Sequence, residues 1–330
     1  MKVLVTGASG FVGRGLLPRL TAAGHTGLAT GRTPPGLLPA GWRGVARADV
    51  LADSLPEAED TGGIEAVVHL EVRQHIPRPT PADVASFELV NVGGTQDWLD
   101  WAARHGVRRF VCVSSIKAVA PASSPRLEDA PLETAANYGG SKARAEERVR
   151  RWAADDYHRS ARILRPAPVY GPGNEANLAA FVRQIISGKP CLVGRGATQK
   201  SVVARTNLAA AIGFALEHAG TGCETFNVSD RETFSLEELA GIIARLASAP
   251  APRRVPEVLA RLCAPVGDLF CSLTGRDFPL TSARLRALVE VSVFPCDKLL
   301  AAGYVHPCST SDALLEMLHW MRSADHAPAT

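Results

Sequence analysis

The chain has 330 residues, of which 46% are hydrophobic and 21% charged, and its formal net charge is +3. These values exclude a disordered chain, a collagen and a coiled coil, and they give no compositional argument for a nucleic-acid partner. At roughly 150 residues per domain, the length favours two domains or one large α/β unit with an appendage.

No apolar run approaches the ~18 residues that a membrane span needs. After Met1 and Lys2 the chain enters a buried-strand pattern, VLVTG, so we expect no signal peptide. The seven cysteines are widely spaced and form no CxxC pair. We therefore expect neither a zinc site nor a disulfide framework, and we place the protein in a reducing cytoplasm.

Strand and helix patterns alternate through the first part of the chain. We expect strands at 2–6, 26–30, 44–48, 65–70, 109–113, 161–164 and 224–228, and helices at 11–23, 92–105 and 138–154. Such alternation implies right-handed crossovers and a parallel sheet covered by helices on both faces. The predicted fold class is therefore α/β, a Rossmann doubly wound parallel sheet.

From about residue 171 the pattern changes to helical stretches broken by Pro and Gly, at 178–187, 206–218, 235–248, 255–273 and 311–322. We expect residues 1–170 to form a dinucleotide-binding domain to which 201–230 return. Residues 171–200 and 231–330 would form a smaller, mainly helical substrate-binding lobe.

The string TGASGFVG places three glycines between the first strand and the first helix. Gly7 would turn the chain sharply off the strand, Gly10 would let backbone N–H groups approach a pyrophosphate, and Gly13 would let the helix pack closely on the sheet. The helix N-terminus would then present free N–H groups to the anion.

The end of the second predicted strand carries Gly31 and Arg32 where an NAD-binding protein would carry a carboxylate for the ribose 2′-hydroxyl. Arginine can pair with a 2′-phosphate, so we favour NADP, with NAD as the alternative. The other reading of Arg32 is a solvated loop charge. Asp49, after the third strand, would accept from the adenine amino group or stay an exposed loop aspartate.

Tyr138 and Lys142 form a YxxxK pattern on a predicted helix, which puts both side chains on one face, one turn apart. A phenol of ordinary pKa about 10 is a poor acid–base group at neutral pH, and a nearby ammonium would lower that pKa. Ser115, at the end of RFVCVSS, would donate to a substrate oxygen. Together these three residues predict catalysis.

These motifs, with VVHL, NVGGT and LRPAPVYGPG, resemble the extended short-chain dehydrogenase/reductase superfamily over residues 1–230. HLEVRQHIP, SSIKAV and VGRGATQKSVVARTNLAAAI are similar to the nucleotide-sugar epimerase/dehydratase branch, close to UDP-glucose 4-epimerase-like proteins. The resemblance implies that Tyr138 is the acid–base, Lys142 tunes it and bonds the nicotinamide ribose, and Ser115 is the oxygen donor. It also implies that Asn91 lies near the cofactor. Asn177 matches an asparagine that meets a nucleotide-sugar diphosphate, and Lys200 sits where an arginine is more usual.

We accordingly expect the cofactor to be bound by Gly7, Ser9, Gly10, Phe11, Val12, Gly13, Arg32, Asp49, Val50, Leu70, Asn91, Tyr138 and Lys142, and the substrate by Ser115, Asn177 and Lys200. We expect hydride transfer on a nucleotide sugar, a UDP-hexose or 4-keto deoxysugar, by an epimerase or a reductase. The alternative is an NADPH-dependent reductase or dehydrogenase of a lipid, steroid or phenolic ketone, because TGRDFPLTSARLRAL resembles steroid- and lipid-directed members as much as sugar ones. A nucleotide-binding redox sensor is disfavoured, because it would have no need for all three of Ser115, Tyr138 and Lys142.

Two departures from the family pattern bear on the site. Glu71 replaces a small residue near the expected cofactor diphosphate and would repel phosphates unless it were turned away or paired, for which Arg73 is the candidate partner. VARTN lacks the usual aspartate, so we expect a differently capped helix there.

Two further groups have competing interpretations. His69 and His75 flank Glu71, but the loop lacks a third ligand, so we expect no metal site. Trp98 and Trp101 lie on a helix that in a related fold forms a two-fold dimer face. Core packing is the favoured reading of the tryptophans, with a homodimer as the alternative.

Overall fold

Seven parallel strands form the central sheet of the computed structural model, in the order β11-β6-β5-β4-β1-β2-β3. The model describes all residues except 56–60, 77, 176, 275–277, 279 and 325–330. The strands are β1 (Lys2–Thr6), β2 (Thr26–Gly31), β3 (Trp42–Ala46), β4 (Ala66–His69), β5 (Arg109–Val113), β6 (Ser160–Pro166) and β11 (Gly222–Val228). All seven predicted strands are present, and the Rossmann-type α/β class is confirmed.

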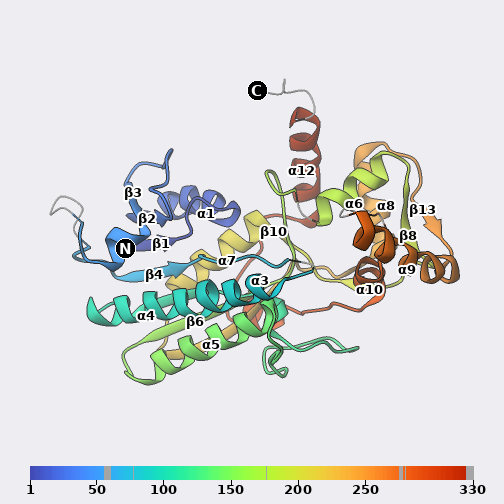
Figure 1. The fold of residues 1–330 in the computed structure, drawn as a ribbon. Coiled ribbons are helices and arrows are strands. Elements are labelled where there is room, and N and C mark those ends of the chain that lie inside the picture. The colour runs from blue at the N-terminus through green and yellow to red at the C-terminus, as the bar shows by residue number, and fades with distance from the viewer. Residues whose placement is uncertain (56–60, 77, 176, 275–277, 279, 325–330) are drawn as a thin grey trace.

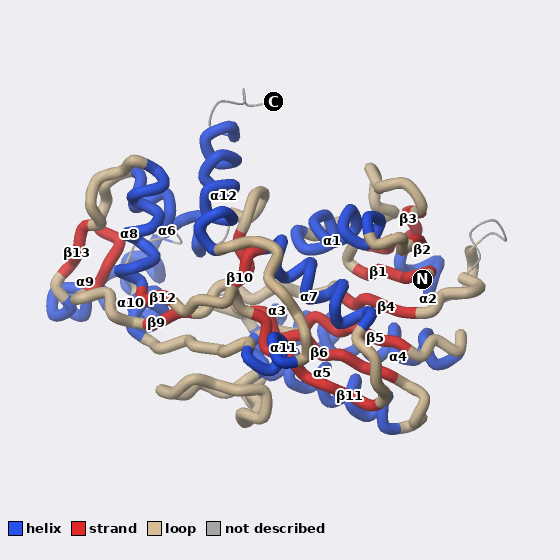
Figure 2. The backbone as a smooth tube through the Cα atoms, turned by 180° about the vertical axis from the view of Figure 1, so that it is seen from behind, coloured by secondary structure: helices blue, strands red, loops and turns tan. Residues whose placement is uncertain are grey.

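Helices cover both faces of this sheet (Figures 1 and 2). Helices α1 (Phe11–Ala22) and α7 (Arg205–Glu217) pack together on one face, whereas α4 (Gly94–Arg104) and α5 (Tyr138–Ala154) cover the other. Because the sheet is covered on both sides, its inner strands are continuous apolar runs rather than alternating ones. In β1, for example, Val3, Leu4 and Val5 are fully buried.

The position of the two tryptophans of α4 decides between core packing and an exposed dimer face for these side chains. Trp98 and Trp101 are both 0% exposed and belong to the core beneath β4 and β5. The core-packing reading is therefore confirmed for these side chains.

The connection between β4 and α4 differs from the prediction. Helix α3 (Pro81–Phe87) begins at a capping box, in which the Thr80 hydroxyl accepts from the Asp83 N–H and the Asp83 carboxylate accepts from the Thr80 N–H. A π-helical segment, η2 (Glu88–Gly93), then joins α3 to α4. The predicted helix at 92–105 is thus the last part of a longer helical run.

The rest of the chain builds a lobe beside the carboxyl ends of the strands (Figure 1). Its elements are β7 (Val169–Tyr170), α6 (Asn177–Ile186), β8 (Pro190–Val193), β9 (Gln199–Lys200), β10 (Val203–Ala204), β12 (Phe234–Ser235), α8 (Leu236–Ala247), β13 (Arg253–Val255), α9 (Glu257–Thr274), α10 (Ser282–Val289) and α12 (Thr310–Ala324). The short helix α11 (Asp297–Ala301) instead returns to the sheet and packs against β11. A separate hydrophobic cluster joins α6, α8 and α12. The division into a dinucleotide domain and a substrate lobe stays a prediction.

Helix α7 begins within the segment VARTN, residues 203–207, and it has no side-chain cap from its own N-cap residue. Its N-cap residue Ala204 instead donates its backbone N–H to Oδ1 of Asp230 at 3.0 Å, and Asn207 donates to the same oxygen at 2.7 Å. The aspartate missing from the motif is therefore replaced by one that follows β11.

Among the described residues, no helix is long and apolar enough to cross a membrane.

Candidate functional site

The glycine loop between β1 and α1 has the shape that the sequence predicts. Gly7 has φ +63°, and a Cβ there would lie 2.9 Å from the backbone nitrogen of Glu71. A Cβ on Gly13 would lie 2.3 Å from the carbonyl oxygen of Ala8. Both positions therefore exclude a side chain, as a close turn and close helix–strand packing require.

The N-terminus of α1 is suited to an anion. Gly10 is the N-cap residue, no described side chain caps the helix, and no acidic residue lies in its first turn. The first N–H groups of an uncapped helix favour a phosphate. Ser9 is exposed, Phe11 and Val12 are half-buried, and the guanidinium of Arg205 lies 5.0 Å from the centroid of the Phe11 ring.

This loop lies where the strand order reverses, between neighbouring strands β1 and β4. Open parallel sheets bind ligands at such a point, outside the carboxyl ends of the strands. The loop after β4 is held there by Thr6, whose hydroxyl accepts the backbone N–H of Leu70 at 3.1 Å and of Glu71 at 3.3 Å. The residues present thus fit a dinucleotide diphosphate.

Residues at the ends of β2 and β3 lie where an adenosine would reach. Arg32 is exposed directly after β2, and no described residue forms an ion pair with it. Asp49 is exposed on the short helix α2 (Arg47–Leu51), whereas the side chain of Val50 is fully buried in the core. Val50 can therefore offer only its backbone to a ligand.

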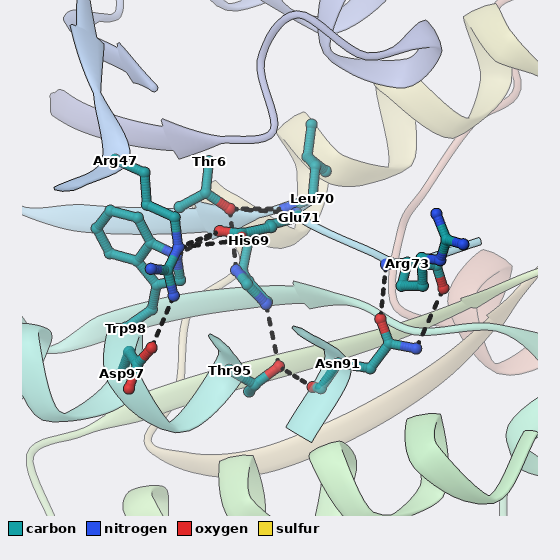
Figure 3. Close-up of polar contacts among 10 residues, drawn as sticks. All are labelled: Thr6, Arg47, His69, Leu70, Glu71, Arg73, Asn91, Thr95, Asp97 and Trp98. Carbon is teal, nitrogen blue, oxygen red and sulfur yellow. Dashed lines mark hydrogen bonds and ion pairs between the residues drawn. The ribbon is translucent and has the colours of Figure 1, made fainter. Parts of the chain in front are cut away.

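Glu71 is paired, but with a different partner from the one expected (Figure 3). Its carboxylate accepts from Nε of Arg47 at 3.0 Å and from the indole N–H of Trp98 at 2.9 Å. Arg47 also donates to Asp97 at 2.7 Å. The expectation that Arg73 pairs with Glu71 is wrong, because the carboxylate points toward α2 and α4 and away from the side chain of Arg73.

Arg73 and Asn91 instead fix the far part of the loop after β4. The guanidinium of Arg73 pairs with Asp83 at 3.2 Å. The buried Asn91 amide accepts from the Arg73 N–H at 2.8 Å and donates to the Arg73 carbonyl (Figure 3). It also donates to the Ser141 hydroxyl at 2.9 Å. Asn91 therefore ties this loop to α5, and its predicted proximity to a cofactor stays a prediction.

His69 is the buried last residue of β4, a central strand of the sheet. Its ring nitrogens bond the hydroxyls of Thr6 at 2.9 Å and Thr95 at 3.0 Å. Burial, with the positive charges of Lys142 and Arg47, lowers the pKa of His69 to about 3. The imidazole is therefore neutral at physiological pH and links β1, β4 and α4.

The structure brings Ser115 and Tyr138 together. Ser115 follows β5 and accepts from the backbone N–H of Lys117 at 3.1 Å, starting the short helix η3 (Ile116–Ala118). Burial raises the pKa of Tyr138 to about 12, and a hydrogen bond with the Ser115 side chain opposes that rise. Asn137 caps α5 by accepting from the Gly140 N–H at 2.9 Å, which sets Tyr138 as the first helical residue.

Lys142 lies deeper than Tyr138, on the same helix. It is 1% exposed, its ammonium donates to the Val113 carbonyl at 3.1 Å, and burial lowers its pKa. We expected the ammonium to lower the pKa of Tyr138. The structure shows that pKa raised, because burial outweighs the other contributions and the ammonium is bonded to the end of β5.

Two aromatic side chains hold the Tyr138 ring. The rings of His75 and Phe87 meet it edge to face at 5.7 and 5.9 Å between centroids. Burial and the charge of Lys117 lower the pKa of His75. The loop after β4 and helix α3 thus help to orient the phenol ring.

A buried ion pair supports Ser114, the residue before Ser115. Glu146 accepts from the Ser114 hydroxyl at 2.7 Å and from Nε and Nη2 of Arg165 at 2.9 and 2.7 Å. Glu146 and Arg165 are essentially unexposed. Since unpairing a buried charge costs several kcal/mol, this pair fixes the ends of β5 and β6 against α5.

Of the predicted substrate residues, Lys200 lies on β9, and its ammonium donates to the Glu290 carbonyl. Burial lowers the pKa of Lys200 to about 8, and the nearby positive charges of Lys117 and Arg126 act in the same direction. Asn177 begins α6, and its side chain lies outside the described part of the structure.

Sequence reasoning missed several residues that shape the site, namely Arg47, His75, Phe87, Asp97 and Glu146. The capping box at Thr80 was a readable signal for α3 and hence for Phe87. No local pattern indicates Arg47, because its partner Glu71 is 24 residues away, in the loop after another strand.

Together the strand order, the glycine loop and the residues after β5 define a Rossmann-type dinucleotide-binding protein with a YxxxK helix. Residues 3–229 match the model of the NAD dependent epimerase/dehydratase family. The chain belongs to this family, which lies within the extended short-chain dehydrogenase/reductases.

Two similar curated proteins span almost the whole chain. One is the N-acetyl-α-D-glucosaminyl-diphospho-ditrans,octacis-undecaprenol 4-epimerase of Escherichia coli O157:H7, which is 26% identical over 96% of this chain and 94% of its own length. The other is the ceramide reductase of Caulobacter vibrioides, 27% identical over 99% and 96%. Among solved structures, MoeE5 in complex with UDP-glucose and NAD superimposes with a TM-score of 0.73 at 22% identity, covering 98% of this chain and 99% of that chain.

The protein is thus an enzyme of an NAD-dependent family in which both epimerases and reductases occur. The likeness to MoeE5 establishes the shared fold.

Proposed function

We propose that the protein transfers a hydride between a nicotinamide cofactor and a carbon that bears a hydroxyl or keto oxygen. The observation that carries this proposal is the Ser115–Tyr138 hydroxyl pair after β5, in the same parallel sheet whose β1 leads into a glycine cradle shaped for a diphosphate. When bound, the nicotinamide supplies the hydride acceptor or donor. The chain's own residues orient the oxygen and move its proton.

In the oxidative direction the phenolate oxygen of Tyr138 would take the proton of the substrate hydroxyl, while a bound nicotinamide would supply the hydride acceptor. In the reductive direction Tyr138 returns a proton to the oxygen of the ketone. Ser115 has a single hydroxyl proton, which would stabilise the Tyr138 phenolate in the free enzyme and would go to the substrate oxygen when substrate is bound. Lys142 supplies a buried positive charge one turn further along α5, and we assign it the role of lowering the pKa of Tyr138 in the working complex.

For the cofactor, we propose that NADP is preferred over NAD. Arg32 stands at the end of β2 where the adenosine ribose would lie, exposed and available for a 2′-phosphate. Arg47 is less available, because Glu71 and Asp97 already occupy its guanidinium. The test is a titration with both reduced cofactors, in which tighter NADH binding would refute the assignment.

For the substrate, our first candidate is a nucleotide sugar, a UDP-hexose or a 4-keto deoxysugar. Lys200 lies within electrostatic reach of two other cations, Lys117 and Arg126, and of one carboxylate, Glu290. A net positive group of this kind would favour a diphosphate. The E. coli relative is named for epimerisation of a sugar joined through a diphosphate.

A second candidate is a ketone or sugar that carries a lipid chain. Helix α9 of the lobe exposes a row of large aliphatic side chains, and the names of both full-length relatives contain a lipid, an undecaprenol and a ceramide. This candidate keeps the same hydride chemistry and changes only what the lobe would bind.

Thermal unfolding with UDP, dTDP and GDP separates these candidates. A ligand at 100 times its Kd should add about 2.7 kcal/mol of stability. A shift with one nucleotide diphosphate supports the nucleotide-sugar substrate. If none of the three shifts the transition while NADPH does, the lipid candidate replaces it.

A further inference from the structure

Lys117 lies on the short turn that carries Ser115. Its backbone N–H donates to the Ser115 hydroxyl at 3.1 Å. Its carbonyl oxygen lies against the start of α5, where a Cβ on Gly139 would come within 2.2 Å of it. Gly139 directly follows Tyr138. The backbone of Lys117 is therefore fixed next to both members of the candidate catalytic pair, whereas its side chain is exposed.

The ammonium of Lys117 is within electrostatic reach of the sheet side and of the lobe. Burial, together with the charge of Lys117, lowers the pKa of His75 in the loop after β4. The same charge helps burial to lower the pKa of Lys200 on strand β9 of the lobe. His75 packs against the Tyr138 ring. The positive charge of Lys117 thus lies close to a neighbour of the phenol on one side and to the lobe on the other.

Lys117 differs from the two other cations of this region in its hydrogen bonds. The Arg126 guanidinium donates to two backbone carbonyls at 3.4 and 3.2 Å, and the Lys200 ammonium donates to the Glu290 carbonyl. No residue in the described part of the chain accepts a hydrogen bond from the Lys117 ammonium or forms an ion pair with it. Its charge is therefore available to a ligand.

The carboxylates nearest to this region are already engaged. Glu133 lies beside the Lys117 backbone, since its N–H donates to the Ala118 carbonyl at 2.8 Å. Its carboxylate accepts from the Ala135 N–H at 2.9 Å and forms no ion pair with a described residue. Glu290 attracts Lys200 and Arg126. An ammonium without a carboxylate partner favours an anion that a substrate brings.

The position of the reacting oxygen decides which part of a substrate Lys117 would meet. In the proposed reaction this oxygen is held by Ser115 and Tyr138. Lys117 is bonded to the first and packs beside the second, so its side chain starts next to the carbon that reacts. A sugar held in this way turns the substituents of its own ring toward Lys117. The diphosphate, beyond the anomeric carbon, would be left to Lys200 and Arg126.

We propose that Lys117 determines substrate specificity by binding a carboxylate carried on the reacting sugar ring. Because this assignment rests on the proposed function, it takes the substrate to be a nucleotide sugar. The substrate class is then an acidic sugar joined to a nucleotide, and a UDP-hexuronic acid is the simplest example. Ammonium and carboxylate form a charge-assisted hydrogen bond that a neutral hexose cannot make.

The test is calorimetric titration of the full chain, loaded with the reduced cofactor that it binds more tightly, against UDP, UDP-glucose and UDP-glucuronic acid. Both sugars carry hydroxyl groups, so they bind beside a reduced nicotinamide without reacting. We expect the wild type to bind UDP-glucuronic acid at least ~10-fold more tightly than UDP-glucose. Lys117→Met should abolish that preference and leave the affinities for UDP and UDP-glucose nearly unchanged. Lys117→Arg keeps the charge and should retain most of the preference.

The matched control is Lys189→Met, which removes the charge of another exposed lysine, next to β8, and should keep the preference. The proposal is overturned if the wild type does not prefer the carboxylate, or if Lys117→Met retains or Lys189→Met equally loses the preference. It is also overturned if Lys117→Met weakens all three ligands alike, since Lys117 would then meet the diphosphate. These outcomes leave the proposed function intact. If the wild type binds none of the three ligands, the nucleotide-sugar substrate itself is refuted, and the role of Lys117 with it.

Discussion

The carboxylate of Glu71 accepts the Nε–H of Arg47 at 3.0 Å, although the two residues follow different strands of the sheet. The same carboxylate accepts the indole N–H of buried Trp98. Three elements, α2, α4 and the loop after β4, are thereby joined next to the glycine loop. The negative charge at the family's small-residue position is thus neutralised within the protein.

Replacing Glu71 by Ala should lower the free energy of unfolding by about 1–3 kcal/mol, because a charged hydrogen-bonded partner is removed from Arg47 and Trp98. Chemical denaturation measures this. The control is Glu175→Ala, which breaks the exposed ion pair with Arg183 and should cost less than about 0.5 kcal/mol. If both variants lost the same free energy of unfolding, the Glu71 pairing would contribute no more than an exposed ion pair.

Tyr138→Phe should reduce turnover by more than ~100-fold while leaving cofactor affinity nearly unchanged, because only the proton-carrying hydroxyl is lost. Single-turnover kinetics measure the rate of the chemical step, and cofactor titration measures the cofactor affinity. Tyr157→Phe, at an exposed position, should leave both as they are. Unchanged turnover in the Tyr138 variant would eliminate this phenol as the acid–base.

The pH profile of alcohol oxidation should depend on Ser115. Tyr138 must be deprotonated to accept a proton, so the rate rises with pH toward the pKa of the phenol. The hydrogen bond with Ser115 lowers that pKa, while burial raises it. Ser115→Ala should therefore move the rising limb to higher pH, whereas Ser115→Thr keeps a hydroxyl and should retain its position. An unmoved limb in the alanine variant would contradict this role.

Arg32→Ser should weaken NADPH binding by ~10-fold or more and leave NADH binding within a few fold, because only NADPH carries the 2′-phosphate. Fluorescence titration of each cofactor measures the two affinities. Arg43→Ser, on the neighbouring strand β3, provides the control for a change in general charge. If the Arg32 variant loses both cofactors alike, the residue is not a specificity determinant.

Acid should destabilise the protein through His69. Burial holds its folded pKa near 3, below the value of about 6.5 in an unfolded chain. The unfolded state therefore binds more protons between these values, and stability falls as pH drops from 6.5 toward 3, by about 1.4 kcal/mol per pH unit from this site.

Urea unfolding at several pH values tests this slope. His69→Gln should remove that part of the slope even if it lowers stability at every pH. The exposed His158→Gln serves as the control. A wild-type slope retained by the His69 variant would exclude this imidazole as its source.

The sheet could be predicted from the sequence because its information is local. Val3, Leu4 and Val5 form a short apolar run next to a glycine turn, and both the strand and the helix after it follow from that pattern. Helix α5 was predicted with its observed bounds, 138–154, and the structure adds that Asn137 caps its first turn.

Of the candidate site, only the residues that belong to sequence motifs could be predicted. The pairing of Glu71 with Arg47 depends on how α2 and α4 are placed across the sheet, and no sequence spacing states that placement. The pKa of Tyr138 depends likewise on burial by His75 and Phe87, which come from a loop and a helix that the periodicity did not mark.

The π-helical segment η2 has a consequence for how this region can change in length. It lets the run from Pro81 to Arg104 continue as one rod while its two α-helical ends keep different rotational settings. A π-helical turn holds one residue more than an α-helical turn, so deleting a single residue within Glu88–Gly93 would leave an ordinary α-helical turn and keep Thr95 and Trp98 on nearly the same face. The same deletion between Thr95 and Trp98, inside α4, would instead turn Trp98 by about 100° and carry it away from the Glu71 carboxylate, so the tolerance of this rod to a lost codon should change within a few residues.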